Sequence, residues 1–158
     1  MKNTTPKSKL VRTLIWIGRI LGGLVLVFAI FMAAMMVRMS YVPSDLNYAT
    51  RRDSDNGLYR VSYTASTGTV PVNQMHQWTL HVETADGQIV EGAAITVDGD
   101  MPQHGHGLPT RPQVTQYLGS GDYLVEGMKF QMGGWWLMDF TITANGQTDA
   151  VHFNMMLK

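Results

Sequence analysis

The sequence predicts an all-β fold, an immunoglobulin-like antiparallel β-sandwich of about seven strands, preceded by one N-terminal transmembrane helix. Residues 20–37 carry no charge, apolar residues alternate in short runs from Leu58 onward, and Gly, Asp and Asn separate those runs. Alternation with a period of two is typical of strands with one buried face. Strands at this spacing over about 100 residues are typical of an immunoglobulin-like sandwich, and no window has a sustained helical stripe.

The uncharged stretch predicts a membrane anchor. As a helix with a rise of ~1.5 Å per residue it spans about 27 Å, close to the ~30 Å hydrocarbon core. Arg19 and Arg38 bound it, and the apolar residues from Leu14 lengthen it if Arg19 snorkels. A cleaved signal peptide is the alternative, but such peptides have a shorter apolar region and a small-x-small cleavage site. Ala33-Ala34 provides no good Ala-x-Ala site, so we favour an uncleaved anchor.

The distribution of charge predicts the orientation of the anchor. Five basic residues precede the span, one follows it, and residues 1–38 contain no acid. The positive-inside rule therefore predicts a single-pass protein of the inner (cytoplasmic) membrane, with a cytoplasmic N-terminus and a periplasmic or otherwise extracytoplasmic C-terminal domain. The formal charge of zero is the sum of +6 in residues 1–38 and −6 in residues 39–158. An acidic exported domain repels phosphate, which excludes nucleic acid as a partner.

Four segments follow from these patterns. They are a cytoplasmic basic segment at 1–13, a transmembrane anchor at 14–38, a tether at 39–56 and an exported β-sandwich domain at 57–158. The tether contains Pro43, three aspartates and the Arg51-Arg52 pair, and it shows neither helical nor strand periodicity. The exported part is long enough for one small core and too short for two domains.

The exported domain contains seven predicted strands. They are Leu58–Ala65, Trp78–Thr84, Ala93–Val97, Val114–Leu118, Asp122–Met128, Trp136–Thr143 and Ala150–Met156. Asp86-Gly87 and Asn145-Gly146 predict hairpin turns between strands, because these dipeptides adopt the positive φ angles of tight turns.

Alternation along the strands also assigns single side chains to a face. It places Met138 and Met155 in the core, and it places His81 and His152 on the solvated faces of their strands. The pair Trp135-Trp136 is expected in the core or as a wall of a site.

Residue chemistry narrows the function. The chain has no cysteine, which excludes disulfides, thiolate zinc sites and thiol catalysis. The acids are scattered over turns and strand faces, and no Ser/His/Asp or paired-carboxylate constellation stands out. We therefore expect no enzymatic activity. The remaining unusual feature is the number of methionines, twelve.

The segment 100–109 breaks the strand pattern with Gly and Pro. His104 and His106 are two residues apart, so both imidazoles project from one face of an extended chain, and Gly105 between them lets the chain curve around a common point. Met101 lies three residues before His104, and residues 127–135 form a second glycine-rich strand end with two more methionines. The alternative is a polar loop whose imidazoles only meet solvent.

Thioethers and imidazoles without a thiolate select a soft metal. Thioether sulfur binds Cu(I) well and Mg²⁺, Ca²⁺ or Mn²⁺ poorly, and imidazole binds Cu(I) and Cu(II) alike. Thioethers also resist the disulfide formation that disables cysteine sites in an oxidising compartment. We therefore predict a copper site, with Cu(I) favoured over Cu(II). The predicted ligands are His104, His106, Met101 and Met132, with Met128, which is alternatively a core residue, and His76 as weaker candidates.

Several motifs occur in an order that resembles a known family. They are Trp78-Thr-Leu-His-Val, the Ala85-Asp-Gly turn, Glu91-Gly-Ala-Ala-Ile-Thr-Val, Met101-Pro-x-His-Gly-His-Gly, Gly121-Asp-Tyr and Phe130-x-Met-Gly-Gly-Trp-Trp. Between about Leu58 and Met155 the chain resembles the YtkA-like domain, a relative of the FixH-like proteins. The resemblance implies an exported immunoglobulin-like domain, often membrane-anchored, associated with copper handling and with the assembly of copper-containing respiratory oxidases. The family's motif falls on Met101, His104, His106 and Met132.

Two functions are compatible with these observations. The first is a metallochaperone, anchored in the membrane by its N-terminal helix, that holds Cu(I) and passes it to a copper-accepting membrane protein or oxidase. The second is a metal-free immunoglobulin-like interaction module that acts as an assembly factor for a membrane complex, its loops being binding loops on a rigid scaffold. Copper uptake by the purified protein distinguishes the two.

Overall fold

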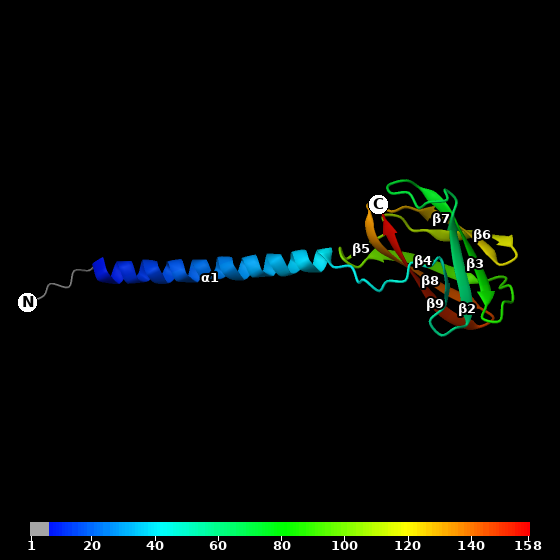
Figure 1. Ribbon diagram of the computed structural model, residues 1–158, viewed down its shortest axis with the longest axis horizontal. Coiled ribbons are helices and arrows are strands. Elements are labelled where there is room, and N and C mark those ends of the chain that lie inside the picture. Colours follow the sequence, from blue (N-terminus) through cyan, green and yellow to red (C-terminus); the bar gives the residue numbers. More distant parts are fainter. Residues whose placement is uncertain (1–6) are drawn as a thin grey trace, which may run out of the picture. The chain divides into compact units, whose positions relative to one another are not determined.

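The structure is a computed structural model that describes residues 7–158, and the first six residues of the predicted basic segment lie outside the described residues. The chain divides into a helical unit that ends at Tyr41 and a unit from Val42 to Lys158 (Figure 1). Each unit has its own organisation, and the two are described in turn.

The helical unit contains α1, which runs from Lys7 to Ser40 and extends beyond both ends of the predicted anchor. Its stretch Lys9–Ser40 is long and apolar enough to cross a membrane. Apolar side chains such as Leu24 and Phe28 are exposed on this helix. Exposed apolar side chains on all sides are expected of a helix surrounded by lipid. This helix can therefore anchor the protein as a single span.

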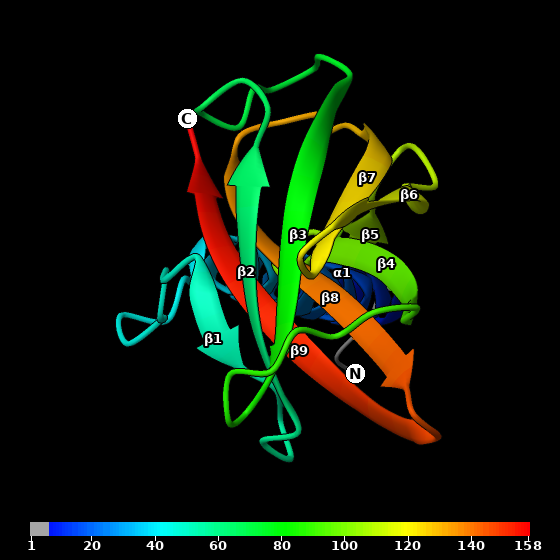
Figure 2. The ribbon, with the colours of Figure 1, turned by 90° about the vertical axis from the view of Figure 1, so that its right-hand side faces the viewer.

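The second unit is a sandwich of two sheets in which the neighbouring strands are antiparallel. One sheet has the order β1-β2-β3-β7-β6, formed by Arg51–Asp53, Tyr59–Ala65, His76–Thr84, Asp122–Met128 and Gln113–Gly119. The other has the order β5-β4-β8-β9, formed by His106–Gly107, Ala94–Met101, Gly134–Ala144 and Gln147–Leu157. Figure 2 shows β2 and β3 of the first sheet crossing in front of β8 and β9 of the second.

The predicted sandwich is confirmed, with every predicted strand present. Alternation of apolar residues did not predict two further strands, β1 and β5. They have three and two residues, which are too few to show alternation. The strand β1 lies inside the predicted tether, which is therefore partly built into the sheet. The strand β5 lies inside the segment that carries the two spaced histidines.

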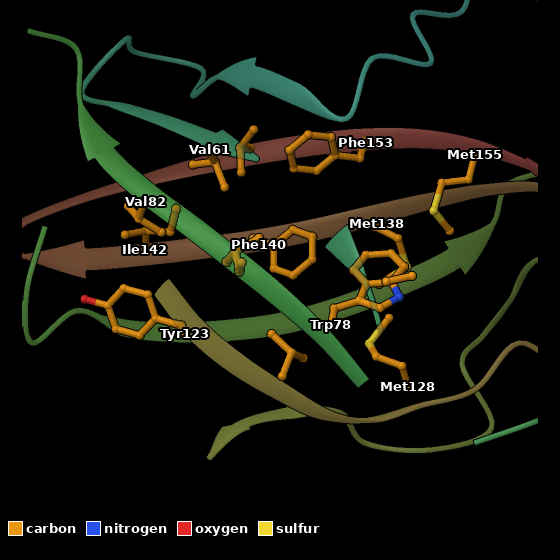
Figure 3. Close-up of a cluster of buried hydrophobic side chains, with 14 of the residues drawn as sticks. Val61, Trp78, Val82, Tyr123, Met128, Met138, Phe140, Ile142, Phe153 and Met155 are labelled. Carbon is orange, nitrogen blue, oxygen red and sulfur yellow. The ribbon is translucent and has the colours of Figure 1, made fainter. Parts of the chain in front are cut away.

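The core between the sheets is rich in aromatic side chains. Trp78 stacks on Tyr63 with ring centroids 4.3 Å apart, and Phe140 meets Phe153 edge to face at 5.9 Å. Burying an aromatic side chain of this size contributes about 3 kcal/mol. Met138 and Met155 are buried in the same core, as alternation predicts (Figure 3).

A buried carboxylate fastens the chain that enters β2 to the start of β9. Asp149 accepts hydrogen bonds from Ser54 Oγ at 2.6 Å, from Asn56 Nδ2 at 2.8 Å and from the backbone N–H of Asn56. Burial, which would raise the pKa of Asp149, is outweighed by the hydrogen bonds from Ser54, the Ala150 backbone, Asn56 and the Leu58 backbone, so its pKa falls from 3.8 to about 2.

Tyr123 connects the two sheets. Its ring is buried on β7, and its hydroxyl donates to the Val90 carbonyl at 2.8 Å and accepts from the Ala93 backbone N–H at 3.1 Å. The residues that it contacts lead into β4 of the opposite sheet. The position of β4, whose far end carries the predicted site, is thus fixed by a hydrogen-bonded tyrosine.

Candidate metal centre

The two spaced histidines are brought together by a tight turn between β4 and β5. The Met101 carbonyl accepts hydrogen bonds from the backbone N–H groups of His104 and Gly105, both at 2.9 Å. Gly105 has φ +67°, a left-handed conformation that a residue with a Cβ rarely adopts. The imidazole rings of His104 and His106 stack with centroids 5.7 Å apart and an interplanar angle of 19°. The rings therefore meet as predicted, although the chain between them turns and is not extended.

Met101 is the last residue of β4, where the turn begins. Its Cα pairs with that of His106 across the β4–β5 ladder, and side chains of directly paired residues project from the same face. Met101 is 0% exposed, while both imidazoles are exposed. A Cβ added to Gly134 would come within 2.9 Å of the Met101 methyl group, so this glycine leaves the space that the thioether occupies.

The loop between β7 and β8 forms the other side of the centre. Trp136, fully buried at the start of β8, meets the His106 ring edge to face with centroids 6.4 Å apart. Its indole N–H donates to the Met132 carbonyl at 3.1 Å. Met132 is 39% exposed. The structure thus places the Met132 loop against the tryptophan that contacts His106, and it leaves this thioether accessible.

The two weaker ligand candidates form a separate buried pair. Met128 and His76 are cross-strand partners on β7 and β3, and both are buried. The rings of Phe130 and Trp136 stand between His76 and His106, with Phe130 centroids 5.8 Å from His76 and 5.1 Å from Trp136. Met128 is therefore a core residue, and the structure does not bring His76 together with the two spaced histidines.

His76 nevertheless has an unusual environment. Its Nδ1 donates to the Gln74 carbonyl at 3.1 Å, because a carbonyl oxygen only accepts. Its Nε2 is buried and has no hydrogen-bond partner among the described residues. A buried ring nitrogen without a hydrogen-bond partner is costly.

Residues 55–141 match the family model described as YtkA-like, which is more than half of the chain. The chain belongs to the YtkA-like family. No curated protein and no solved structure matches the chain. The matched region includes both spaced histidines together with Met101 and Met132, and it ends within β8. The relation to FixH-like proteins stays a prediction.

The other histidines of this YtkA-like domain are paired with carboxylates. His81 Nδ1 lies 2.7 Å from Asp122 Oδ1, and His152 Nδ1 lies 2.5 Å from Asp139 Oδ1. The hydrogen bond with Asp139 is the main cause that raises the pKa of His152. Both rings lie on the outer faces of their strands, as predicted, and each also has a carboxylate as its direct cross-strand partner. Strand register, which the sequence does not reveal, makes these pairs.

The candidate donors at the β4–β5 turn are the imidazoles of His104 and His106. Among residues 7–158, no group of three or more His, Cys, Asp or Glu side chains is placed to hold one ion. A structural zinc site, with four protein ligands, needs such a group. Met101 and Met132 lie on the adjoining segments, and thioether ligands favour Cu(I). Sequence reasoning missed Gln131, whose amide contacts His106 and which carries no signal of metal chemistry.

Proposed function

We propose that this protein is a membrane-anchored, exported copper-binding protein that holds Cu(I) by Met and His ligands for copper delivery or for the assembly of a respiratory oxidase. The observation that carries the proposal is the stacked, exposed pair His104 and His106 next to Met101, the buried cross-strand partner of His106. Membership of the YtkA-like family supports it, because the resemblance of this sequence to that family implies copper handling.

The exposure of the donors suits a protein that hands its metal on. His104 and His106 face solvent, and Met132 is partly exposed, so an acceptor can approach the metal without unfolding the sandwich. Met101, buried at the end of β4 and paired with His106, is the proposed fixed soft donor. Cu(I) needs few ligands and carries a single charge, and a mixed imidazole–thioether set satisfies its softness. The proposed role is binding and transfer, and no reaction is assigned to the domain.

Removal of both exposed imidazoles tests the site. We expect His104→Ala plus His106→Ala to lower the affinity for Cu(I) by at least about 100-fold, because two of the proposed ligands are lost and second-shell changes alone already cost 10–100-fold at metal sites. The full chain in detergent is titrated with Cu(I) under reducing conditions against a competing chelator.

The matched control is His81→Ala plus His152→Ala, which removes two imidazoles elsewhere. This variant should bind Cu(I) as the parent does, since both rings pair with carboxylates away from the turn. Circular dichroism of both variants checks that the sandwich persists. If His104→Ala plus His106→Ala binds Cu(I) as tightly as the parent, the assigned ligands are wrong.

The proposed topology has the N-terminus in the cytoplasm and the domain in the periplasm or another extracytoplasmic space. The absence of native cysteine allows a background-free test with the variants Ser8→Cys and Ser44→Cys. A membrane-impermeant maleimide should label Ser44→Cys in intact spheroplasts and Ser8→Cys only after lysis. The reverse pattern would refute the orientation, and recovery of a shorter, soluble chain would refute the uncleaved anchor.

A metal-free interaction module that acts as an assembly factor is the second candidate. One observation favours it: the turn around the histidines is already closed by hydrogen bonds of the protein itself, including one to His106. A purified protein that binds no Cu(I) but is captured with one membrane complex through an intact β4–β5 turn would support this candidate over the first.

A further inference from the structure

Gln131 holds His106 through a hydrogen bond whose direction can be deduced. The amide nitrogen of Gln131 lies 3.2 Å from the Gly107 carbonyl oxygen and 3.0 Å from His106 Nδ1. A carbonyl oxygen only accepts, so the amide atom that faces it must be the NH₂ group. The same NH₂ group therefore donates its second hydrogen to His106 Nδ1. A nitrogen that accepts a hydrogen bond carries no proton, so the proton of neutral His106 is on Nε2.

The opposite end of this amide is unsatisfied. Gln131 Oε1 is buried and has no hydrogen-bond partner among the described residues. The side chain thus makes two hydrogen bonds through one group and leaves the other group unpaired. If the proton of His106 moved to Nδ1 and the amide turned over, Oε1 would accept from Nδ1–H, but it would then face the Gly107 carbonyl. The Gly107 carbonyl therefore favours the first arrangement in the metal-free protein.

We propose that Gln131 is a positioning residue that holds metal-free His106 in the Nε2-protonated tautomer, and that copper gains His106 only by releasing this side chain. The inference rests on the proposed function. A metal needs a ring nitrogen with a free lone pair. While Gln131 is in place, the lone pair of Nδ1 is engaged and Nε2 carries the proton. Binding at Nδ1 displaces the amide, and binding at Nε2 requires the proton on Nδ1, so both routes break the contact.

Release of Gln131 also affects the accessible thioether. Met132 is the next residue, and Gln131 ties the loop that carries it to the β4–β5 turn through Gly107 and His106. Copper binding and freedom of this loop are therefore coupled. When copper gains His106 on the β4–β5 turn, the loop loses the hydrogen bond between Gln131 and His106. Gln131 lowers the affinity of the site for copper and keeps its two loops together when the metal is absent.

Two variants separate this role from a merely structural one. Gln131→Glu offers only acceptors, so it should place the proton of His106 on Nδ1 and open Nε2, as carboxylate partners do for metal-bound histidines. Gln131→Leu removes the contact without adding charge. We expect Cu(I) affinity to rise on the order of tenfold in Gln131→Glu and about threefold in Gln131→Leu, since one or two hydrogen bonds no longer compete. Gln116→Glu, on exposed β6, is the control for charge alone.

The test combines long-range ¹H–¹⁵N NMR of the imidazoles, on the full metal-free chain in detergent at about pH 8, with chelator-competition titrations of Cu(I). The expected result is the Nε2–H tautomer of His106 in the parent and in Gln116→Glu, the Nδ1–H tautomer in Gln131→Glu, and tighter Cu(I) binding in both Gln131 variants. A parent with Nδ1–H, or Gln131 variants that bind Cu(I) no more tightly than the parent, would overturn the inference. If the tautomers are as expected but none of these proteins binds Cu(I), the proposed function is wrong. The control of the His106 tautomer by Gln131 would then still hold.

Discussion

Replacing Trp136 by alanine will lower the free energy of unfolding of the sandwich domain by about 4 kcal/mol, the usual cost of a large cavity in a core. The indole is fully buried, and it meets Phe130 edge to face with centroids 5.1 Å apart. The same substitution removes the ring beside His106 and the hydrogen bond to the Met132 carbonyl. Urea unfolding of the full chain in detergent measures the first effect, and Cu(I) titration of the folded variant measures the second, for which we expect weaker binding.

The neighbouring tryptophan is the matched control. Trp135 is half-buried and its indole N–H donates to Asn154 Oδ1 at 2.9 Å on the opposite side of β8. Trp135→Ala should lower the free energy of unfolding by about 1 kcal/mol, the net value of one partly buried hydrogen bond. It should leave the Cu(I) affinity unchanged. Equal losses in the two variants would contradict the assignment of Trp136 to the inner face.

Asp149→Asn will destabilise the domain by about 3 kcal/mol at neutral pH. Asp149 accepts hydrogen bonds from the Ser54 hydroxyl and the Asn56 backbone N–H. In the variant, the NH₂ group of the asparagine replaces one carboxylate oxygen, so a buried donor loses its acceptor. Because the pKa of Asp149 is about 2 in the folded protein against an ordinary value of 3.8, about 2 kcal/mol of this stability depends on its charge.

The pH dependence has a defined sign. A lowered pKa stabilises the folded state fully above the ordinary pKa and loses that contribution as the pH falls through the folded pKa. The difference in unfolding free energy between the parent and Asp149→Asn should therefore shrink as the pH falls from about 5 to about 2. Asp45→Asn, at an exposed position, is the control and should track the parent throughout. A constant difference across this range would show that the charge of Asp149 is not responsible.

The fold could be predicted because most strands are long enough to display their alternation. Met138, Phe140 and Ile142 repeat every second residue, so one face of β8 is buried whatever its neighbours are. Met101 is different, because a methionine beside a proline in a glycine-rich segment looks like a loop residue. It is buried because Gly134, more than thirty residues later, leaves room for its methyl group.

The rest of the site depends on strand register and on contacts between distant segments. The histidines His81 and His152 are paired with carboxylates only because β3 aligns with β7 and β8 with β9. Gln131 acquires its role from a carbonyl and an imidazole 24 and 25 residues away. Sequence spacing indicates which residues carry suitable donors, and it does not indicate which nitrogen of His106 the Gln131 amide contacts.

The unequal exposure of the two thioethers also determines which of them peroxides reach first. Peroxides convert accessible methionines to sulfoxides, whose oxygen makes the side chain polar and removes its soft donor. Met132, at 39% exposure, is open to this damage, while Met101, at 0%, is shielded by the core. Oxidation would thus remove the outer sulfur first and leave the inner sulfur and the imidazoles intact. A reductase of methionine sulfoxides could then repair the outer position on the folded domain, because the damaged side chain is the one it can reach.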